Sequence, residues 1–252
     1  MAPTKSDRRG IARSIADDLR DQIRAGQLAP GARLPTTRQL AERYGVSPKT
    51  VSSAVDILKV EGLVLGEQGG RRTVRADRPV TWNLTQFERG SRRDSTSMDD
   101  WSTAIKDAGR LPAQHVTVTR EPASPEVAAW LQLEPGAEVV RRLRTRTVDE
   151  RPFQLSTSWF PASIALGTLL EEQRDVAVPG GILKSIGHPQ TRIRDEITAR
   201  MPHPEETEQL DLPPGTPVVE HVRIGFGTST PVRVMKTIAP GDRHMLVYEM
   251  DI

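Results

Sequence analysis

The sequence of 252 residues contains no cysteine, which excludes disulfides and thiolate metal sites. It also lacks any run of about 18 uninterrupted apolar residues, the length that a membrane-spanning helix needs. Its N-terminus is polar and basic and has no apolar stretch behind it, so export by a signal peptide is not expected. These absences predict a cytoplasmic protein with no membrane partner.

Motifs for catalysis and for cofactor binding are also missing. The five histidines are scattered, and none stands four residues from another or in a Gly-x-Ser-x-Gly elbow. The sequence Pro179-Gly180-Gly181 lacks the Lys-Ser/Thr that would follow in a phosphate-binding loop. We therefore expect no cofactor, no metal and no enzymatic activity.

Charge is distributed unevenly along the chain. Residues 1–78 carry 15 Lys and Arg against 9 Asp and Glu, a net charge of +6. The remaining residues carry 20 against 24, a net charge of −4, although the whole chain has a net charge of only +2. A compact basic module beside an acidic one suggests that only one part of the protein binds a polyanion.

The basic module has the pattern of a winged helix-turn-helix domain. Apolar residues recur with helical spacing over 10–25, and shorter helices are predicted at 38–44 and 48–60. Two β-prone runs at 63–65 and 73–75 flank a glycine-rich, basic turn, which predicts a hairpin. In this kind of domain the last helix lies in the major groove of DNA.

Binding DNA in this way requires groups at helix N-termini for phosphates, polar side chains on the first turns of the third helix for base edges, and basic groups on the wing. All three are present. The alternative is an ordinary solvated basic face. The candidate DNA contacts are Thr36, Arg38, Ser47, Lys49, Thr50, Ser52, Ser53, Gly69, Gly70, Arg71 and Arg72.

Part of this module closely resembles the winged helix-turn-helix of GntR-family bacterial transcriptional regulators. The resemblance covers residues 23–41 and continues through Gly45-Val46-Ser47-Pro48-Lys49-Thr50-Val51 to Glu61-Gly62-Leu63-Val64. The resemblance implies that Arg38, the first turn of the third helix and the wing glycine contact operator DNA. Many members place Arg where Pro48 and Ser52 stand here, which shifts more of the binding onto Lys49, Thr50 and Ser53.

The second part of the chain, residues 97–252, is predicted to be an α+β domain built around an antiparallel sheet and joined to the first domain, residues 8–78, by a polar linker at 79–96. The predicted strands cover 115–119, 138–148, 153–160, 218–226, 232–238 and 245–250. The predicted helices cover 99–108, 124–131, 163–171, 182–186 and 204–210.

One strand of this domain has an arginine at every second position. Arg142, Arg144 and Arg146 share a face, as do Ser156 and Ser158 on the next predicted strand. If the two strands pair as a hairpin, guanidinium and hydroxyl groups converge on one surface that suits a carboxylate, a phosphate or a polyhydroxylated ligand. The alternative is a solvent-facing side of the sheet.

Several motifs of this region resemble the UTRA domain of the HutC subfamily: Arg144-x-Arg146-x-x-Asp149-x-x-Pro152, Trp159-Phe160-Pro161, Gly187-His188-Pro189, Glu196–Pro202 and Leu212–Val218. The resemblance implies the fold of chorismate lyase and a small-molecule effector. Taken with the strand pattern, it gives the candidate effector contacts Ser97, Arg144, Arg146, Ser156, Ser158, Gly181, Leu183, Glu196 and Arg233. A Glu is common where Arg233 stands and a Tyr where Ala239 stands, so we expect an acidic or larger effector.

Together these observations predict a homodimeric transcriptional repressor that binds a pseudo-palindromic double-stranded operator and responds to a small-molecule effector, for which an anion is expected. Two alternatives stay open. The second domain could serve dimerisation alone, on a constitutive DNA-binding protein. It could also be a lyase-type enzyme, for which Glu196 is the candidate acid or base.

Overall fold

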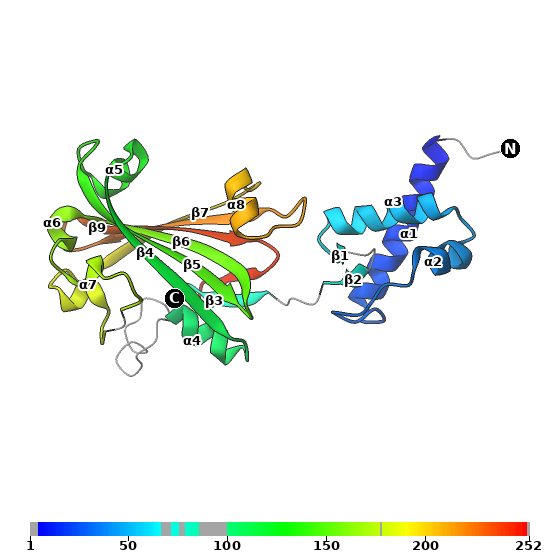
Figure 1. Cartoon of the computed structure of the whole chain (residues 1–252), viewed down its shortest axis with the longest axis horizontal. Helices are drawn as coiled ribbons and strands as arrows, with labels where there is room; N and C mark the ends of the chain where they lie inside the picture. Colours follow the sequence, from blue (N-terminus) through cyan, green and yellow to red (C-terminus); the bar gives the residue numbers. More distant parts are fainter. Residues whose placement is uncertain (1–4, 67–71, 76–78, 86–99, 177, 251–252) are drawn as a thin grey trace. The chain divides into compact units, whose positions relative to one another are not determined.

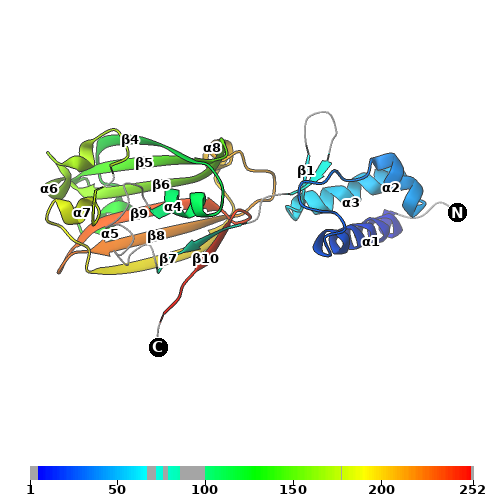
Figure 2. The same ribbon diagram turned by 90° about the horizontal axis from the view of Figure 1, so that it is seen from below.

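The computed structural model describes residues 5–66, 72–75, 79–85, 100–176 and 178–250. The chain divides into two compact units, and the main boundary falls between Arg78 and Pro79. Figures 1 and 2 show a helical unit at the N-terminal end and a unit with a large sheet after it. Of the described helices, none combines the length and the apolar character that crossing a membrane would require.

The first unit contains three helices, α1 (Lys5–Arg24), α2 (Thr37–Tyr44) and α3 (Pro48–Val60). Apolar side chains from all three form one core, in which Leu19, Leu40, Val55 and Leu58 are fully buried. The helices predicted over 38–44 and 48–60 are therefore present, and α1 begins five residues earlier than predicted.

A small antiparallel hairpin follows the helices. It consists of β1 (Val64–Gly66) and β2 (Arg72–Val74), with Val64 opposite Val74. The segment before α2 adds to this hairpin through a bridge between Arg33 and Thr73. Three helices with an appended hairpin make the winged helix-turn-helix that the sequence predicted.

The second unit is an α+β domain around a six-stranded sheet, as predicted. Neighbouring strands are antiparallel, in the order β4-β5-β6-β9-β8-β7. The strands of this sheet are β4 (Pro112–Pro122), β5 (Glu138–Val148), β6 (Arg151–Pro161), β7 (Arg192–Arg200), β8 (Val218–Phe226) and β9 (Pro231–Pro240). The other elements are α4 (Asp100–Asp107), α5 (Pro125–Leu131), α6 (Ala162–Ala165), the 3-10 helix η1 (Leu169–Glu171), α7 (Ile182–Ser185), α8 (Pro204–Gln209), β3 (Val80–Asn83) and β10 (His244–Val247).

The two faces of the sheet are covered differently. On one face, α5 packs Val127, Ala128 and Leu131 onto an apolar layer that includes Val222 and Val234. We call this the α5 face. Figure 1 shows α4 on the other side of the sheet from α5.

The opposite face carries the side chains that alternate with this apolar layer, among them Arg142, Arg144 and Arg146. We call it the arginine face. At one end it is covered by α6, η1 and α7, which pack against Val140 and Phe160. At the other end it is covered by α4, whose Trp101 packs against Phe153 and Val148.

Three differences from the predicted elements stand out. Strand β7 was not predicted at all. Residues 80–83, placed in the linker by the sequence, form β3, which pairs in parallel with β10. The helix predicted over 163–171 is split into α6 and η1, because Gly167 between them has a φ of 71°, which no helix continues through.

Candidate DNA-binding surface and effector site

Three local caps define the start of α2 and the turn between α2 and α3. Thr36 accepts a hydrogen bond from the Gln39 backbone N–H, and the Gln39 side chain accepts one from the Thr36 N–H, which completes a capping box. Gly45 ends α2 with a φ of 64°, and Ser47 caps α3. Thr36 and Ser47 thus fix the helix starts that the sequence proposed as phosphate contacts.

Polar and basic side chains project from the first turns of α3. Lys49 and Ser53 are exposed, and Ser52 is half-buried. Arg38, on the first turn of α2, has 88% of its side chain exposed, and its partner among the described residues is Glu42, in a long ion pair at 3.6 Å. These side chains are accessible to a DNA backbone or to base edges.

Thr50 corrects one prediction. It is only 7% exposed and packs with the core of the first unit. Its hydroxyl lies 2.9 Å from the hydroxyl of Ser47, so it supports the cap of α3. The helical spacing explains the error, because Thr50 lies four residues before Ala54 and eight before Leu58, both of which are buried.

The wing is described only in part. Arg72 begins β2, and its guanidinium donates a hydrogen bond to the hydroxyl of Thr37 at the start of α2, at 3.1 Å. The predicted contacts Gly69, Gly70 and Arg71 lie outside the described residues.

The hairpin predicted for the effector site is present, with β5 and β6 joined by a two-residue turn. Asp149 and Glu150 both have positive φ, 50° and 64°, as a type I′ turn requires. This turn sets the register that places Arg144 opposite Ser156, and Arg142 opposite Ser158. The predicted convergence of guanidinium and hydroxyl groups therefore occurs, on a face that is largely buried.

Arg142 is fully buried, and its guanidinium is occupied by the protein itself. It donates hydrogen bonds to the carbonyl oxygens of Leu170, Glu172 and Arg174, at 2.6, 2.8 and 2.9 Å. Burial lowers the pKa of Arg142 to about 10, and repulsion from Arg144 adds to this. Arg142 thus fastens the segment after η1 to the sheet and is not available to a ligand.

Arg144 and Arg146 have different surroundings. Arg146 donates a hydrogen bond to Gln114 at 3.1 Å, and its guanidinium carbon lies 4.7 Å from the centre of the Trp101 ring. Arg144 has a side chain that is 14% exposed and an ion pair with Asp175 at 3.9 Å. In the described part of the chain it makes no hydrogen bond.

Two serines on β6 complete the centre of this face. Ser156 shares a hydrogen bond with Thr237 of β9 at 3.2 Å. Ser158 is fully buried, and its hydroxyl finds no partner among the described residues. A buried hydroxyl without a partner is costly, and a water molecule or a ligand group at this position would supply the hydrogen bond.

The remaining predicted effector contacts fall into three groups. Gly181 and Leu183 lie at the start of α7, and Leu183 packs against the apolar cluster over the arginine face. Arg233 lies on the arginine face of β9, with a nitrogen 2.9 Å from the sulfur of Met235. Ser97 lies outside the described residues.

Glu196 corrects another prediction. It lies opposite Val222 on β8, a residue of the apolar layer, and therefore projects on the α5 face. It forms an ion pair with Arg194 at 2.7 Å. The sheet separates its carboxylate from Arg144, so it cannot serve as an effector contact or as an acid or base beside that arginine.

A charged cluster on the arginine face was not predicted. Asp195 accepts hydrogen bonds from Arg223 at 2.6 and 2.7 Å, from His221 at 2.8 Å and from Tyr248 at 2.7 Å. Burial raises the pKa of Asp195, but the bonds from Arg223, His221 and Tyr248 outweigh it and leave the pKa below its usual range. Burial and the bond to Asp195 raise the pKa of Tyr248 to about 12.

This cluster holds two segments that are distant in the sequence. Tyr248 follows β10, and the ring of Trp82 in β3 meets the ring of His221 edge-on, with centroids 5.7 Å apart. The Asp195 cluster thus fastens the β3–β10 pair to the sheet. Ile193, Asp195 and Ile197 stand at every second position and share one face of β7, so the signal available in the sequence was a carboxylate between two apolar neighbours on that face.

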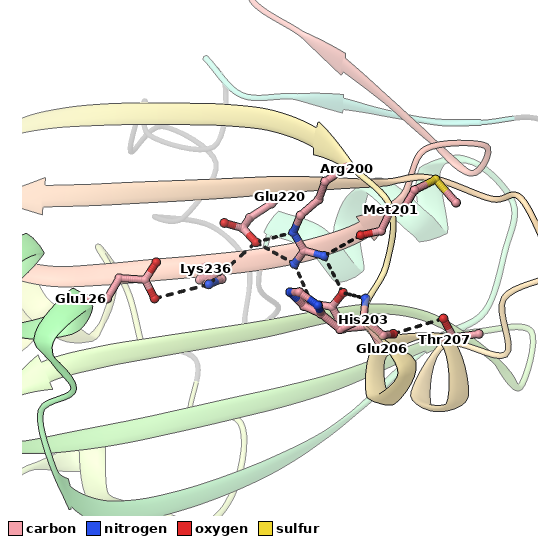
Figure 3. A network of polar contacts seen from close by, with 8 residues as sticks. All are labelled: Glu126, Arg200, Met201, His203, Glu206, Thr207, Glu220 and Lys236. Carbon is pink, nitrogen blue, oxygen red and sulfur yellow. Dashed lines mark hydrogen bonds and ion pairs between the residues drawn. The ribbon is translucent and has the colours of Figure 1, made fainter.

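A second polar network lies on the α5 face, shown in Figure 3. Arg200 of β7 donates to Glu220 of β8 at 2.9 Å and forms two hydrogen bonds of 2.7 Å with Glu206 of α8. Lys236 of β9 links Glu220 to Glu126 of α5, at 3.7 and 3.5 Å. The network fixes α8 against the end of the sheet and is separate from the arginine face.

Two family models match the chain. Residues 11–74 match the bacterial regulatory proteins of the gntR family, and residues 109–245 match the UTRA domain, which is a ligand-binding effector domain. An uncharacterised HTH-type transcriptional regulator of Streptomyces coelicolor is 32% identical over 215 residues, covering 82% of this chain and 80% of its own.

The HTH-type transcriptional repressor NagR of Bacillus subtilis is 26% identical and covers 94% of this chain and 93% of its own. The crystal structure of a GntR-family transcriptional regulator superposes with a TM-score of 0.64 at 27% identity, covering 96% of this chain and 98% of its own. The chain therefore belongs to the GntR family of bacterial transcriptional regulators and carries a UTRA domain behind its winged helix-turn-helix.

Proposed function

We propose that the protein is a homodimeric repressor whose operator binding is controlled by an anionic small molecule held at Arg144. The domains of this proposal are residues 8–78 for DNA binding and 97–252 for effector binding and dimerisation. Two relatives are named repressors, NagR and the mannosyl-D-glycerate transport/metabolism system repressor MngR of Escherichia coli. The UTRA architecture agrees with the HutC subfamily.

The DNA-binding part of the proposal rests on α3. Its first turns present Lys49, Ser52 and Ser53, while its apolar residues are buried in the core. In a helix-turn-helix the N-terminal residues of the recognition helix reach base edges in the major groove. Two copies of the chain would place two such helices on the half-sites of a pseudo-palindromic operator.

The effector part rests on one observation: the side chain of Arg144 is largely buried but makes no hydrogen bond to the described residues. A guanidinium carries five N–H donors and cannot lose its charge. Arg144 is mostly buried, and its counter-charge among the described residues is the carboxylate of Asp175, at 3.9 Å. A ligand with a carboxylate or phosphate group would supply the short, charge-assisted hydrogen bonds that this side chain lacks.

No catalytic role is part of the proposal. The one acid or base that the sequence offered, Glu196, lies on the α5 face in an ion pair with Arg194.

A pair of lysine variants tests the DNA-binding part. Operator fragments would first be selected from random DNA with the purified protein, and their affinity measured by fluorescence anisotropy at several salt concentrations. Each phosphate contact contributes about 0.9 to the slope of log K against log salt. Lys49→Ala should weaken binding and lower that slope by about one.

Lys59→Ala is the matched control, because Lys59 lies in the last turn of the same helix, beside Asp56 at 3.5 Å. It should leave both the affinity and the slope close to the wild-type values. Equal effects of the two substitutions would exclude the first turn of α3 as the DNA-contacting element.

A further inference from the structure

The loop after η1 brings a carboxylate to the effector arginine. This loop, residues 172–176, is described throughout, and Asp175 Oδ1 lies 3.9 Å from Arg144 Nε. The Asp175 side chain is 31% exposed, against 14% for Arg144. The carboxylate is therefore closer to solvent than the cation that it faces.

The first half of the same loop is fastened to the sheet. Arg142 holds the carbonyl groups of Glu172 and Arg174. The side-chain amide of Gln173 accepts a hydrogen bond from the Val118 N–H at 2.8 Å and donates one to the Val118 carbonyl at 2.6 Å. These bonds hold the backbone that leads to Asp175 against the sheet.

The contact between Asp175 and Arg144 is much weaker than the bonds around it. A strong Arg–carboxylate pair has N–O distances of about 2.7–2.9 Å and is often bidentate. At 3.9 Å the carboxylate supplies a counter-charge without a hydrogen bond. Arg144 is thus neutralised in part, and its donors stay available.

We propose that Asp175 is an internal competitor of the effector. In the ligand-free protein it occupies the position of the counter-charge of Arg144, and the anionic group of the effector displaces it. Because the loop is tethered, the competing carboxylate is present at a high effective concentration. Asp175 therefore sets the ligand concentration at which the regulator responds. This inference rests on the proposed role of Arg144 as the anion-binding group.

Removal of the competing charge should strengthen anion binding. Inorganic phosphate is the probe, titrated into the full-length protein in a buffer without other multivalent anions and followed by calorimetry. Asp175→Asn keeps the shape of the side chain, and it should bind phosphate about threefold to tenfold more tightly than the wild type. Arg144→Gln should remove saturable binding, also in the double variant with Asp175→Asn.

Glu172→Gln is the matched control for loop charge. Glu172 belongs to the same loop, but its carboxylate pairs with Arg174 at 2.6 Å. It should bind phosphate as the wild type does. An equal gain in Glu172→Gln would show a general charge effect and overturn the proposal.

The outcomes separate the two claims. If Arg144→Gln loses phosphate binding while Asp175→Asn stays within a factor of two of the wild type, Asp175 is no competitor, and the anion site itself stands. If Arg144→Gln binds phosphate as well as the wild type does, or if no variant binds it, the anion site falls and the proposed effector class falls with it.

Discussion

The Asp195 cluster allows a prediction about stability that can be worked from the structure. Arg223 donates two hydrogen bonds to the Asp195 carboxylate, at 2.6 and 2.7 Å, and Arg223 and His221 are 4% and 1% exposed. Asp195→Asn removes the negative charge and turns an N–H₂ group toward donors. Breaking a buried charge pair by neutralising one of its partners costs about 3–5 kcal/mol.

Tryptophan fluorescence is a suitable assay, because all four tryptophans, Trp82, Trp101, Trp130 and Trp159, belong to the second unit. Urea unfolding followed in this way reports on the effector domain without a signal from the winged domain. The free energy of unfolding falls by about 2 kcal/mol per molar urea, so a loss of about 3–5 kcal/mol in Asp195→Asn corresponds to an unfolding midpoint roughly 2 M lower.

Asp149→Asn is the control for this substitution. Its carboxylate pairs with Arg110 at 2.8 Å but is 46% exposed, and Asn tolerates the positive φ of that turn. A pair this exposed contributes less than about 1 kcal/mol. If Asp195→Asn destabilises the domain no more than Asp149→Asn does, the Asp195 cluster does not hold the β3–β10 pair as described.

Three further predictions concern other sites. Burial lowers the pKa of His244 to about 4 in the folded protein. As the pH falls, the imidazole is therefore protonated in the unfolded chain before it is protonated in the folded one. The free energy of unfolding of the effector domain should fall by on the order of 3 kcal/mol between pH values of about 6.5 and 4. His244→Gln should flatten that part of the pH profile of the urea midpoint, and an unchanged profile would assign it to other groups. Thr50→Val should cost about 1 kcal/mol of winged-domain stability, measured by circular dichroism of that domain's thermal transition. In Thr50→Val the slope of log K against log salt for operator binding should stay unchanged, and a lower slope would indicate that Thr50 contacts DNA. Thr36→Ala should destabilise α2 by about 1 kcal/mol in the same melting experiment, whereas Thr36→Ser, which keeps the capping oxygen, should not.

The winged domain could be predicted from the sequence because its signals are local. Helix caps, the glycine at the end of α2 and the apolar spacing of α3 each act over a few residues. Thr50 was wrongly predicted to contact DNA, because the prediction used its hydroxyl group and not its position on the buried side of α3. A hydroxyl at the start of α3 can equally bond a base or the neighbouring cap, and burial decides between them.

The sheet of the second domain was predicted less completely. Strand β7 was missed because charged residues stand on both of its faces, so the alternation of apolar and polar residues is absent. Its charges are paired across the sheet, Arg200 with Glu220 and Asp195 with Arg223. Such pairs join residues about 20 to 30 positions apart and leave no local signal.

The arginine strand shows what the sequence could and could not predict about the effector site. Its alternation correctly indicated a shared face and a hairpin with β6. The different roles of the three arginines depend on the loop after η1 and on α4, whose positions over the sheet no periodicity describes. Arg142 is bonded to that loop, Arg146 is covered by α4, and Arg144 faces Asp175.

The central claim is that the operator is bound through α3 and released through an anion at Arg144. The most direct test takes a ligand that raises the melting temperature of the wild-type protein in a metabolite screen and measures operator affinity with and without it in two variants. We predict that Arg144→Gln binds the operator as the wild type does but no longer responds to the ligand. Lys49→Ala should bind the ligand normally and the operator weakly. A ligand response in Arg144→Gln equal to that of the wild type would contradict the account.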